Sequence, residues 1–574
     1  MEREECSHNG ADTSIHQNSL RGPHILAKMI KDALEKDRHG VNKDYIAVIS
    51  HLSATEMKPV VMRRWLQALK LCVSQLTRDF DLLVGATLRF SWFDKDPEIV
   101  QLYIDYLANL ISAQTFYLKS TLTSLLQQLW IPTNPASVSC NIHQAMDTIL
   151  QLVPTAPSVL MPLLTKNYPF KGRGPDIQEV ALKNVLYLTT YCPALRDGVW
   201  ELIFHQMLSI DVDIPRLEEH GVISDDTDGT QFHVEVDTEP NPCYNKEGLN
   251  LEPSYSHVQV MSNESAEKMD VMMTVLLDHL HSLCYNDGVL LVDLARHFLT
   301  LLLKIFDRMV LPTHACSHVQ FLLFRLTSLH ESFPGIFLDF LWEKFQDFNT
   351  PAVLRQTCAA YIASYIARSK FIPMMMAKLC LSIMMRRIHE YLDGCSPDNM
   401  KPEVKLHGPF FSLCQAVFYV FVFRHKALLD SPDGLKFSRQ LNFERVISSR
   451  LNPLKVCLPT VVEVFASITN HHEIVFCYSI LEQNKRLILS TPVVTPEVKV
   501  QQQEQANLLD CYFPFDPYCL KRSSLYVQSL YQEWEEMEIA ELEDDHSSMA
   551  SSLPNSLPMT TSLDSSLPYS VSPS

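Results

Sequence analysis

Runs of apolar residues at helical spacing, separated by short breaks, are the feature that most constrains how this 574-residue chain can fold. Between residues 25 and 210 each run covers roughly three to five helical turns and stops at proline, asparagine or a charged cluster. Glycine, which sheets need at bulges and hairpin turns, accounts for only 15 residues. The pattern therefore predicts an all-α chain whose closely spaced helices pack as antiparallel pairs.

The segment from 351 to 373 is the clearest of these helices. Its apolar side chains recur at i, i+4, i+7, i+8 and i+11, on one helical face: Leu354, Cys358, Tyr361, Ile362 and Tyr365. Small residues beside this face let a neighbouring helix approach closely. A Leu-Arg pair followed by small residues and an aliphatic stripe is typical of the inner helix of a HEAT-type repeat. The sequence therefore favours a HEAT-repeat-type α-solenoid over a generic multi-helix bundle.

Charge is spread unevenly and divides the chain into a body and two acidic appendages. Residues 211–270 carry a net charge of −12 and residues 533–574 one of −9, so the total of −18 leaves a body near +3. The first acidic stretch has few periodic apolar residues, which predicts a disordered insertion. The expected organisation is a flexible tail at 1–24, N-terminal helical repeats at 25–210, the acidic disordered insertion at 211–268, C-terminal helical repeats at 269–500, a docking segment with a short acidic helix from about 523 to 543 within 501–546, and a disordered Ser/Pro-rich tail at 547–574.

The N-terminus, the hydropathy and the cysteines indicate an intracellular protein. The first residues, Met-Glu-Arg-Glu-Glu-Cys, are charged where a secretory signal is apolar. The most apolar stretch, 416–423, is far shorter than the ~20 residues that a bilayer core needs, so we expect no transmembrane segment. The 15 cysteines are scattered without a CxxC pair, which is typical of reduced thiols.

Motifs for catalysis are missing from the sequence. It has no phosphate loop, GxSxG elbow, HExxH pair or dinucleotide fingerprint, so we expect no enzyme activity, no catalytic residue and no cofactor. The best metal candidate is the group His314, Cys316 and His318, because imidazole and thiolate are good zinc ligands. A structural zinc site takes four ligands and a second pair is missing nearby, so the sequence favours a structural or capping role and no metal site.

Basic residues and serines or threonines before proline are the remaining signals. Basic residues usually lie on a solvated surface, but a weak contact with DNA is an alternative for them. The residues are Arg355, Arg368, Lys370, Arg386, Arg387, Lys521 and Arg522. The candidate phosphorylation sites are Ser396, Ser431, Thr491, Thr495 and Ser572. A phosphate adds about −1.5 to −2 charges, enough to break or create a charge-matched contact, so we expect protein kinases and phosphatases as partners.

Several long strings in the chain resemble one known family. The longest is Leu-His-Gly-Pro-Phe-Phe-Ser-Leu-Cys-Gln-Ala-Val-Phe-Tyr-Val-Phe-Val-Phe-Arg-His-Lys at 406–426. Others lie at 109–114, 311–314, 318–321, 366–373, 441–445, 451–455, 513–517 and 520–522. In order and content they resemble the RNA polymerase I-specific transcription initiation factor family, also called TIF-IA, over roughly residues 25–535.

The resemblance implies a HEAT-repeat solenoid with a non-catalytic role in the nucleus and nucleolus. Members bind RNA polymerase I at its stalk subunits and bridge it to a promoter-bound, TBP-containing selectivity factor, which enables ribosomal RNA gene transcription under control by phosphorylation. Without the resemblance, the residues also fit a generic α-solenoid adaptor or scaffold, such as a nuclear-transport protein.

The resemblance also implies contact residues. The motif at 366–370 matches one linked to the promoter factor, which makes Arg368, Ser369 and Lys370 the candidate contacts. The candidate polymerase contacts are Ser112 and Gln114, and in a second region Phe513, Phe515, Lys521 and Arg522. Two phenylalanines around Pro514 suggest an anchor that docks into a groove, and we favour docking within the protein itself.

Overall fold

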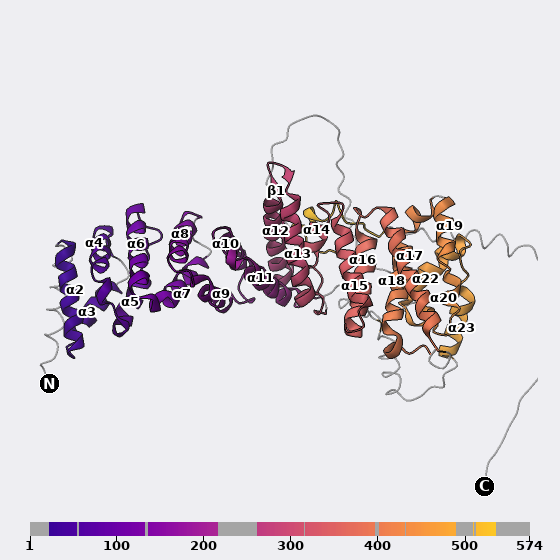
Figure 1. Cartoon of the computed structure of the whole chain (residues 1–574), viewed down its shortest axis with the longest axis horizontal. Helices are drawn as coiled ribbons and strands as arrows, with labels where there is room; N and C mark the ends of the chain where they lie inside the picture. Colours follow the sequence, from indigo (N-terminus) through magenta and orange to yellow (C-terminus); the bar gives the residue numbers. More distant parts are fainter. Residues whose placement is uncertain are drawn as a thin grey trace, which may run out of the picture. The chain divides into compact units, whose positions relative to one another are not determined.

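The computed structural model describes residues 22–53, 57–131, 136–215, 261–314, 316–396, 401–430, 432–489, 509 and 513–534. The chain divides into two compact units: unit 1 is residues 1–372 with 511–531, and unit 2 is residues 373–510 with 532–574. The described residues are almost entirely helical, which confirms the all-α prediction (Figure 1). The expected tail at 547–574, residues 1–21 of the N-terminal tail and residues 216–260 of the expected insertion lie outside the described residues.

The first part of unit 1 is a succession of helices in two rows. They are α2 (Pro23–Arg38), α3 (Lys43–Leu52), α4 (Pro59–Lys70), α5 (Asp81–Leu88), α6 (Pro97–Ala113), α7 (Leu118–Leu129), α8 (Ala136–Leu152), α9 (Ala156–Asn167), α10 (Pro175–Tyr191) and α11 (Arg196–Asp211). Short 3₁₀ turns join some of them: η1 (Val73–Gln75), η2 (Arg78–Phe80), η3 (Thr115–Tyr117) and η4 (Pro193–Leu195).

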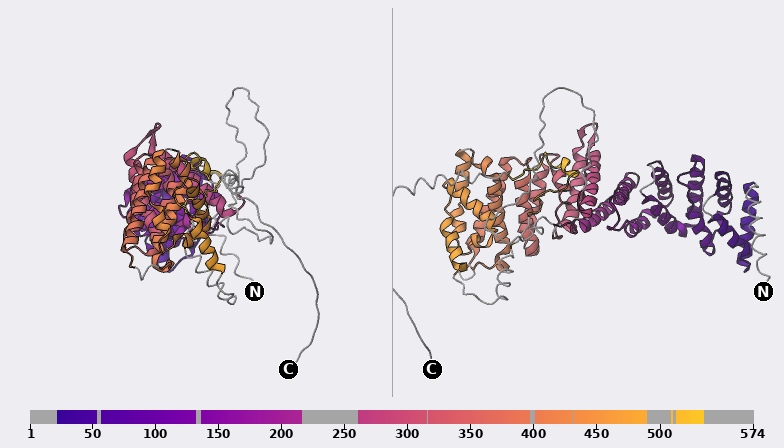
Figure 2. Two further views of the ribbon diagram at one scale, coloured as in Figure 1. Left: turned by 90° about the vertical axis from the view of Figure 1, so that its right-hand side faces the viewer. Right: turned by 180° about the vertical axis from the view of Figure 1, so that it is seen from behind.

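The packing within this part is that of an α-solenoid. Helices α2, α4, α6 and α8 contact one another in turn as one row, while α3, α5, α7 and α9 form the second row. Both rows are visible from the front and from behind (Figures 1 and 2). Each helix buries one face against its own pair and another against the next pair, which is how stacked repeats build a continuous core. The predicted HEAT-repeat-type architecture is confirmed.

The second part of unit 1 continues after the undescribed residues 216–260. Its elements are α12 (Glu264–Cys284), β1 (Tyr285–Asn286), β2 (Val289–Leu290), α13 (Val292–Ile305), the π-helical turn η6 (Phe306–Val310), α14 (Phe321–Thr327), α15 (Phe333–Gln346) and α16 (Ala352–Arg368). Helix α12 packs on α10 and α11, so the helices on both sides of the acidic stretch share one unit.

The boundaries of the acidic stretch differ from the expected 211 and 268. Asp211 is the last residue of α11, and α12 begins at Glu264. The side chain of Asn263 caps α12 by accepting hydrogen bonds from the backbone N–H groups of Ser265 and Ala266, at 2.8 and 3.1 Å. This cap starts the helix at Glu264, within residues 211–268, which the negative charge had suggested to be an insertion.

A short β-hairpin, with two residues in each strand, follows α12 and was not predicted from the sequence. Strands β1 and β2 pair antiparallel, with Tyr285 opposite Leu290. Asp287 and Gly288 form the turn with φ of +48° and +78°, the left-handed conformation that a type I′ turn needs at both central positions. The Asp-Gly dipeptide is the usual signal for such a hairpin.

The helix predicted within 351–373 is α16. Four of the five residues of its expected apolar face are buried, and Leu354 is half-buried. Tyr361 and Tyr365 are fully buried, and Phe306 lies edge-on to the Tyr361 ring with 4.9 Å between ring centroids. The Tyr365 hydroxyl donates to Thr327 Oγ1 at 2.6 Å, so the polar end of this ring is satisfied within the core.

Unit 2 is built around one long helix. Its elements are α17 (Met374–Gly394), α18 (Val404–Leu429), α19 (Pro432–Gln440), α20 (Phe443–Ile447), α21 (Pro453–Val456), α22 (Pro459–His471) and α23 (Tyr478–Leu489). Helix α18 contacts α17, α19, α21 and α22. By length and composition α18 is apolar enough to cross a membrane, but 83% of its most apolar window is buried inside the unit, as in the core helix of a globular unit.

Two asparagines shape the turns of unit 2. Asn442 and Asn452 precede α20 and α21 with φ of +53° and +46°. Asparagine tolerates this left-handed conformation better than other residues with a side chain, which explains its presence before each short helix. Phe443, the first residue of α20, then packs against Phe421 and Phe465.

A buried carboxylate joins α11 to the segment before α14. Asp211 Oδ2 accepts hydrogen bonds from the backbone N–H groups of Ser317, His318 and Val319 at 3.1, 2.9 and 3.1 Å. Its carboxyl also contacts Cys316 Sγ at 3.0 Å and His318 Nδ1 at 2.8 Å. These contacts give Cys316 and His318 a structural role, whereas His314, the third residue of the predicted group, is exposed.

The same contacts set the ionisation of this cluster. Burial alone would raise the pKa of the Asp211 carboxyl, but the hydrogen bond and charge of His318, with the Cys316 and backbone donors, hold it below its usual range. Burial and the nearby Asp211 charge raise the pKa of the Cys316 thiol far above its usual value, so Cys316 acts as a hydrogen-bond donor.

We expect the Asp211→Asn variant to lower the free energy of unfolding by about 3 kcal/mol, because an amide in this place cannot accept the same set of donors. A lowered carboxyl pKa contributes stability above about pH 4, the ordinary value of an aspartate, and that stability is lost as the pH falls through the folded-state pKa. The gap in melting temperature between wild type and variant should therefore narrow in acid. Asp213→Asn, at an exposed ion pair with Lys171, is the control and should change stability little; an equal effect of both variants would contradict the assignment.

Candidate functional site

A segment from the C-terminal part of the chain lies across unit 1. Residues 513–531, which we call the return strap, belong to unit 1 although the chain forms unit 2 before reaching them. The strap contacts α12, α14 and α16 through side chains described below. It carries the second group of predicted polymerase contacts and covers the predicted promoter-factor motif.

The anchor of the strap is Phe515. Its ring lies among four aromatic rings of α14 and α16, with centroid distances of 5.2 to 5.8 Å: Phe321, Phe324, Tyr361 and Tyr365. Phe515 is fully buried and Phe513 is 8% exposed. Docking within the protein itself, which the sequence favoured, is confirmed. The prediction of Phe513 and Phe515 as polymerase contacts is corrected, because their side chains fill the interior of unit 1.

The start of the strap also binds the end of α16. Asp516 forms an ion pair with Arg368, whose guanidinium lies over the Tyr531 ring at 5.2 Å from its centroid. The backbone N–H of Lys370 donates to the carbonyl of Leu530 at 2.9 Å. Ser369 and Tyr531 form an isolated antiparallel bridge. The motif at 366–370 is therefore paired with both ends of the strap.

This pairing changes which motif residues can meet a partner. The Arg368 side chain is 11% exposed and Ser369 is fully buried, so both are corrected from partner contacts to structural residues of unit 1. A cation in such a place needs a paired anion, and Asp516 supplies it. Lys370 is exposed and stays a candidate.

The second attachment of the strap is to acidic side chains of α12. Asp270 is fully buried and accepts hydrogen bonds from the backbone N–H groups of Lys521, Arg522 and Ser523 at 3.1, 2.8 and 2.8 Å. The Ser523 hydroxyl donates to the same carboxylate at 2.5 Å. Four donors on one carboxylate satisfy most of its acceptor sites, which is what makes its burial tolerable.

Two further acids of α12 extend this attachment. The Arg522 guanidinium pairs with Glu267, and the Tyr526 hydroxyl donates to Asp278. Burial and the hydrogen bond to Asp278 raise the pKa of Tyr526 to about 12, so its hydroxyl keeps its proton at neutral pH. The predicted polymerase contacts Arg522 and Lys521 thus differ: Arg522 is half-buried in the attachment, whereas the Lys521 side chain is exposed.

The expected short helix from about 523 to 543 is wrong for its described part. Only η9 (Ser523–Tyr526), a 3₁₀ turn, is helical there, and residues 527–534 run through turns and the bridge to Ser369. The pairing of Leu530 and Tyr531 with the end of α16 takes the backbone groups that a helix would use. Residues 535–546 lie outside the described residues.

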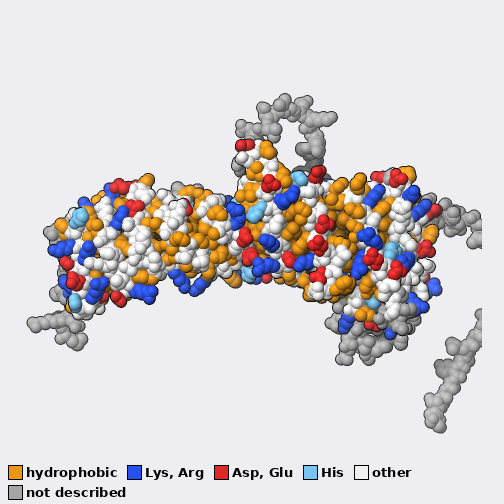
Figure 3. All heavy atoms as spheres, in the orientation of Figure 1, with side chains coloured by type: hydrophobic (Ala, Val, Ile, Leu, Met, Phe, Trp, Pro, Cys, Tyr) orange, Lys and Arg blue, Asp and Glu red, His pale blue; other side chains and the backbone are white. Residues whose placement is uncertain are grey.

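The remaining predicted sites lie elsewhere. Ser112 is exposed near the end of α6 and Gln114, its C-cap residue, is half-buried. Ser396 is exposed after α17. The other phosphorylation candidates, Ser431, Thr491, Thr495 and Ser572, lie outside the described residues. On the face shown in Figure 3, few charged side chains cover α8, whereas acidic and basic side chains alternate over α12 and α13.

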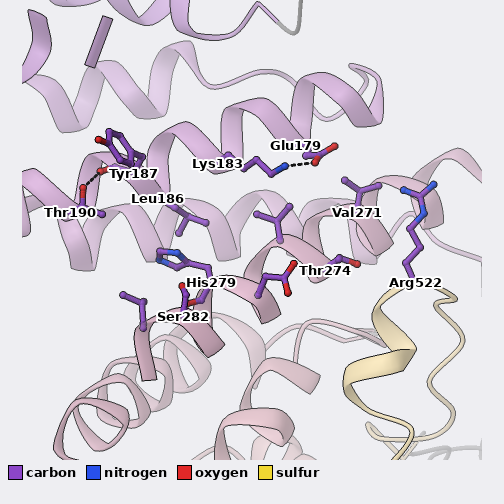
Figure 4. Close-up of a pocket in the computed structure, with 13 residues that line it drawn as sticks. Glu179, Lys183, Leu186, Tyr187, Thr190, Val271, Thr274, His279, Ser282 and Arg522 are labelled. Atoms are coloured by element: carbon purple, nitrogen blue, oxygen red, sulfur yellow. Dashed lines mark hydrogen bonds and ion pairs between the residues drawn. The ribbon is translucent and has the colours of Figure 1, made fainter. Parts of the chain in front are cut away.

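A groove of about 580 Å³ runs between α10 and α12 and ends at the strap (Figure 4). Its floor is largely apolar, with Leu186, Val271 and Val275, and its rim includes the Glu179–Lys183 ion pair, at 2.6 Å, and Arg522. Burial lowers the pKa of His279 in its wall to about 4, so this imidazole is neutral at physiological pH. The groove is therefore a largely apolar surface between two packed helices, with charged side chains at its rim.

Sequence reasoning missed Asp211, Glu267 and Asp270. Asp270 stands within the apolar run Met-Asp-Val-Met-Met of α12, so it falls among buried positions of the helix. An acid on an apolar helical face is the signal that could have identified it, because such a carboxylate must find several donors. The sequence could not show which segment supplies those donors.

Comparisons with known proteins agree over nearly the whole chain. The family model described as RNA polymerase I specific transcription initiation factor RRN3 matches residues 22–539. The chain is 35% identical over 545 residues to the Mus musculus RNA polymerase I-specific transcription initiation factor RRN3, covering 90% of this chain and 82% of that protein. It is 31% identical over 566 residues to the Schizosaccharomyces pombe factor of the same description, covering 93% and 89%.

A solved structure supports the fold. The crystal structure of RNA polymerase I transcription initiation factor Rrn3 is similar to this chain with a TM-score of 0.70 at 20% sequence identity. The match covers 90% of this chain and 99% of that one.

We expect the Phe515→Ala variant to destabilise unit 1 by about 3–5 kcal/mol, because it empties an aromatic cage in the core. Limited proteolysis should then cut the strap faster than in the wild type. Leu525→Ala is the matched control, since Leu525 lies on the same strap but is 76% exposed. Equal proteolysis rates for Phe515→Ala and the wild type would show that Phe515 does not anchor the strap.

Proposed function

The chain belongs to the family of RNA polymerase I specific transcription initiation factors RRN3, and we propose that it bridges RNA polymerase I to a promoter-bound selectivity factor. The family membership makes it an RNA polymerase I initiation factor with a nuclear role in ribosomal RNA transcription, and a non-enzymatic one. Contact with the polymerase stalk subunits, the TBP-containing selectivity factor, a nucleolar location and control by kinases and phosphatases are parts of the proposal.

The family match over residues 22–539 is the observation that carries this function. A solenoid suits bridging because each repeat adds surface and separate stretches can meet separate partners. We assign the polymerase contact to Ser112 on α6 and to Gln114, the C-cap residue of that helix, with Lys521 on the strap as a second point. We assign the promoter-factor contact to the exposed Lys370 after α16.

Control by phosphorylation is part of the same proposal. A phosphate of about −1.5 to −2 charges at a contact weakens binding to an acidic partner and strengthens binding to a basic one. Ser396 is the described candidate that is exposed. The alternative, a generic α-solenoid adaptor such as a nuclear-transport protein, fits the helices equally well, but its expected co-purifying partners are transport receptors or cargo without polymerase.

Charge reversal at Lys370 tests the promoter-factor contact. We expect Lys370→Glu to weaken binding to the purified selectivity factor by about tenfold, about 1.4 kcal/mol, because it places an acid where a cation is proposed to meet the partner. The melting temperature should stay near that of the wild type, since the strap bonds the backbone of Lys370 and not its side chain. Lys166→Glu, exposed on α9, is the control. Unchanged affinity of Lys370→Glu would remove the assignment.

A pull-down with purified RNA polymerase I tests the other contact. The immobilised chain should retain the polymerase, and phosphatase treatment of the chain should change the amount retained. We expect Ser112→Glu to reduce retention by about tenfold, because a fixed charge replaces a neutral contact, while Ser158→Glu, exposed on α9, leaves it unchanged. Loss of retention with both variants, or with neither, would contradict a specific role for Ser112.

A further inference from the structure

In the attachment of residues 521–526 to α12, the negative charges all lie on α12. Glu267, Asp270 and Asp278 provide the acceptors, and the strap provides the donors. Carboxylates without their protons accept hydrogen bonds and repel any anion brought next to them. The attachment is therefore sensitive to an added negative charge on the strap.

Two adjacent serines occupy this attachment in different ways. Ser523 is fully buried, and its hydroxyl is taken by Asp270. Ser524 is half-buried at the surface, and its hydroxyl donates to the carbonyl of Lys521 at 2.6 Å within the 3₁₀ turn. Of the two, Ser524 is therefore the more accessible to an enzyme.

The residues around Ser524 form a pattern that a kinase with an acidic substrate groove can bind. Lys521 and Arg522 stand three and two positions before Ser524, and Leu525 follows it with 76% of its surface exposed. Two cations before the serine complement acidic residues in such a groove, and the exposed apolar residue after it can enter a small pocket. The serines and threonines before proline in this chain lack that arrangement.

We propose that Ser524 is a phosphorylation site for a kinase that recognises basic residues, and that its phosphate loosens the strap from α12. This deepens the control by phosphorylation in the proposed function and rests on that function for its biological effect. The reaction transfers the terminal phosphoryl group of ATP to the Ser524 oxygen, releasing ADP and the hydroxyl proton.

Three changes follow from the phosphate, and all weaken the attachment. The esterified oxygen can no longer donate to the Lys521 carbonyl, so an acceptor faces an acceptor. About −1.5 to −2 charges arrive beside the carboxylates of α12. The Arg522 guanidinium is drawn from Glu267 to the phosphate, because Arg–phosphate pairs are strong and often bidentate.

The consequence concerns the two ends of the strap. They hold Phe515 in its cage and pair with the residues around Lys370. A strap detached at its middle holds these ends less firmly, so the motif at 366–370 opens more often. Phosphorylated and unphosphorylated chains would then differ in access to the proposed promoter-factor contact.

The test uses the full chain, ATP and the catalytic subunit of a cAMP-dependent protein kinase as the probe, with the site of phosphate mapped by mass spectrometry. We expect phosphate on Ser524 in the wild type, none at this position in Ser524→Ala, and about tenfold slower incorporation in Lys521→Gln. Lys521→Gln tests kinase recognition without removing the bond to Asp270, because the Lys521 side chain is exposed and that bond comes from its backbone. A wild-type chain that takes up no phosphate at Ser524 overturns the site.

Hydrogen exchange then measures the loosening. The backbone N–H groups of Lys521, Arg522 and Ser523 should exchange at least about tenfold faster in the phosphorylated chain, because their acceptor is Asp270. Unchanged exchange in a chain fully phosphorylated at Ser524 overturns the release. Neither measurement involves polymerase or selectivity factor, so a failure of the bridging proposal would leave both results intact and is separately detectable.

Discussion

Buried carboxylates with several hydrogen-bond donors are the constraint on which the rest of unit 1 depends. A carboxylate out of water is costly unless donors surround it, so its position dictates where the donors must be. Asp211 at the end of α11 fixes the segment before α14, and Asp270 in α12 fixes residues 521–523 of the strap. Both join segments more than a hundred residues apart, and neither relies on periodic packing between neighbouring repeats.

These two carboxylates give an otherwise quasi-one-dimensional array of repeats contacts between segments far apart in the sequence. In a solenoid each repeat contacts only its neighbours, so local openings can spread from one end. The return strap contacts α12, α14 and α16 at once, through Asp270, Phe515 and Arg368. It therefore ties α12, which already packs on α14, to α16 further along the chain.

Sequence reasoning recovered what local periodicity encodes and missed what distant contacts decide. The helices between residues 25 and 210 and the helix α16 follow from apolar spacing, because spacing is a property of a few adjacent turns. The strap's course follows from Asp270 and Arg368, whose partners lie far along the chain. The expected helix after Ser523 gave way for the same reason, since pairing of Tyr531 with Ser369 overrides local propensity.

Two contact regions inferred from the resemblance, 366–370 and 513–522, bind each other in the structure. This changes how substitutions in them must be interpreted. Arg368 was expected to supply charge to a partner, but its guanidinium is held between Asp516 and the Tyr531 ring. Removing it leaves Asp516 without its cation and loosens the strap, so reduced partner binding in an Arg368 variant would report a change in unit 1. Lys370, two residues later, presents its side chain outward while only its backbone pairs with Leu530. The Lys370 side chain can therefore be altered without disturbing the fold. A substitution at Lys370 reports on partner binding, whereas one at Arg368 also changes the packing of unit 1.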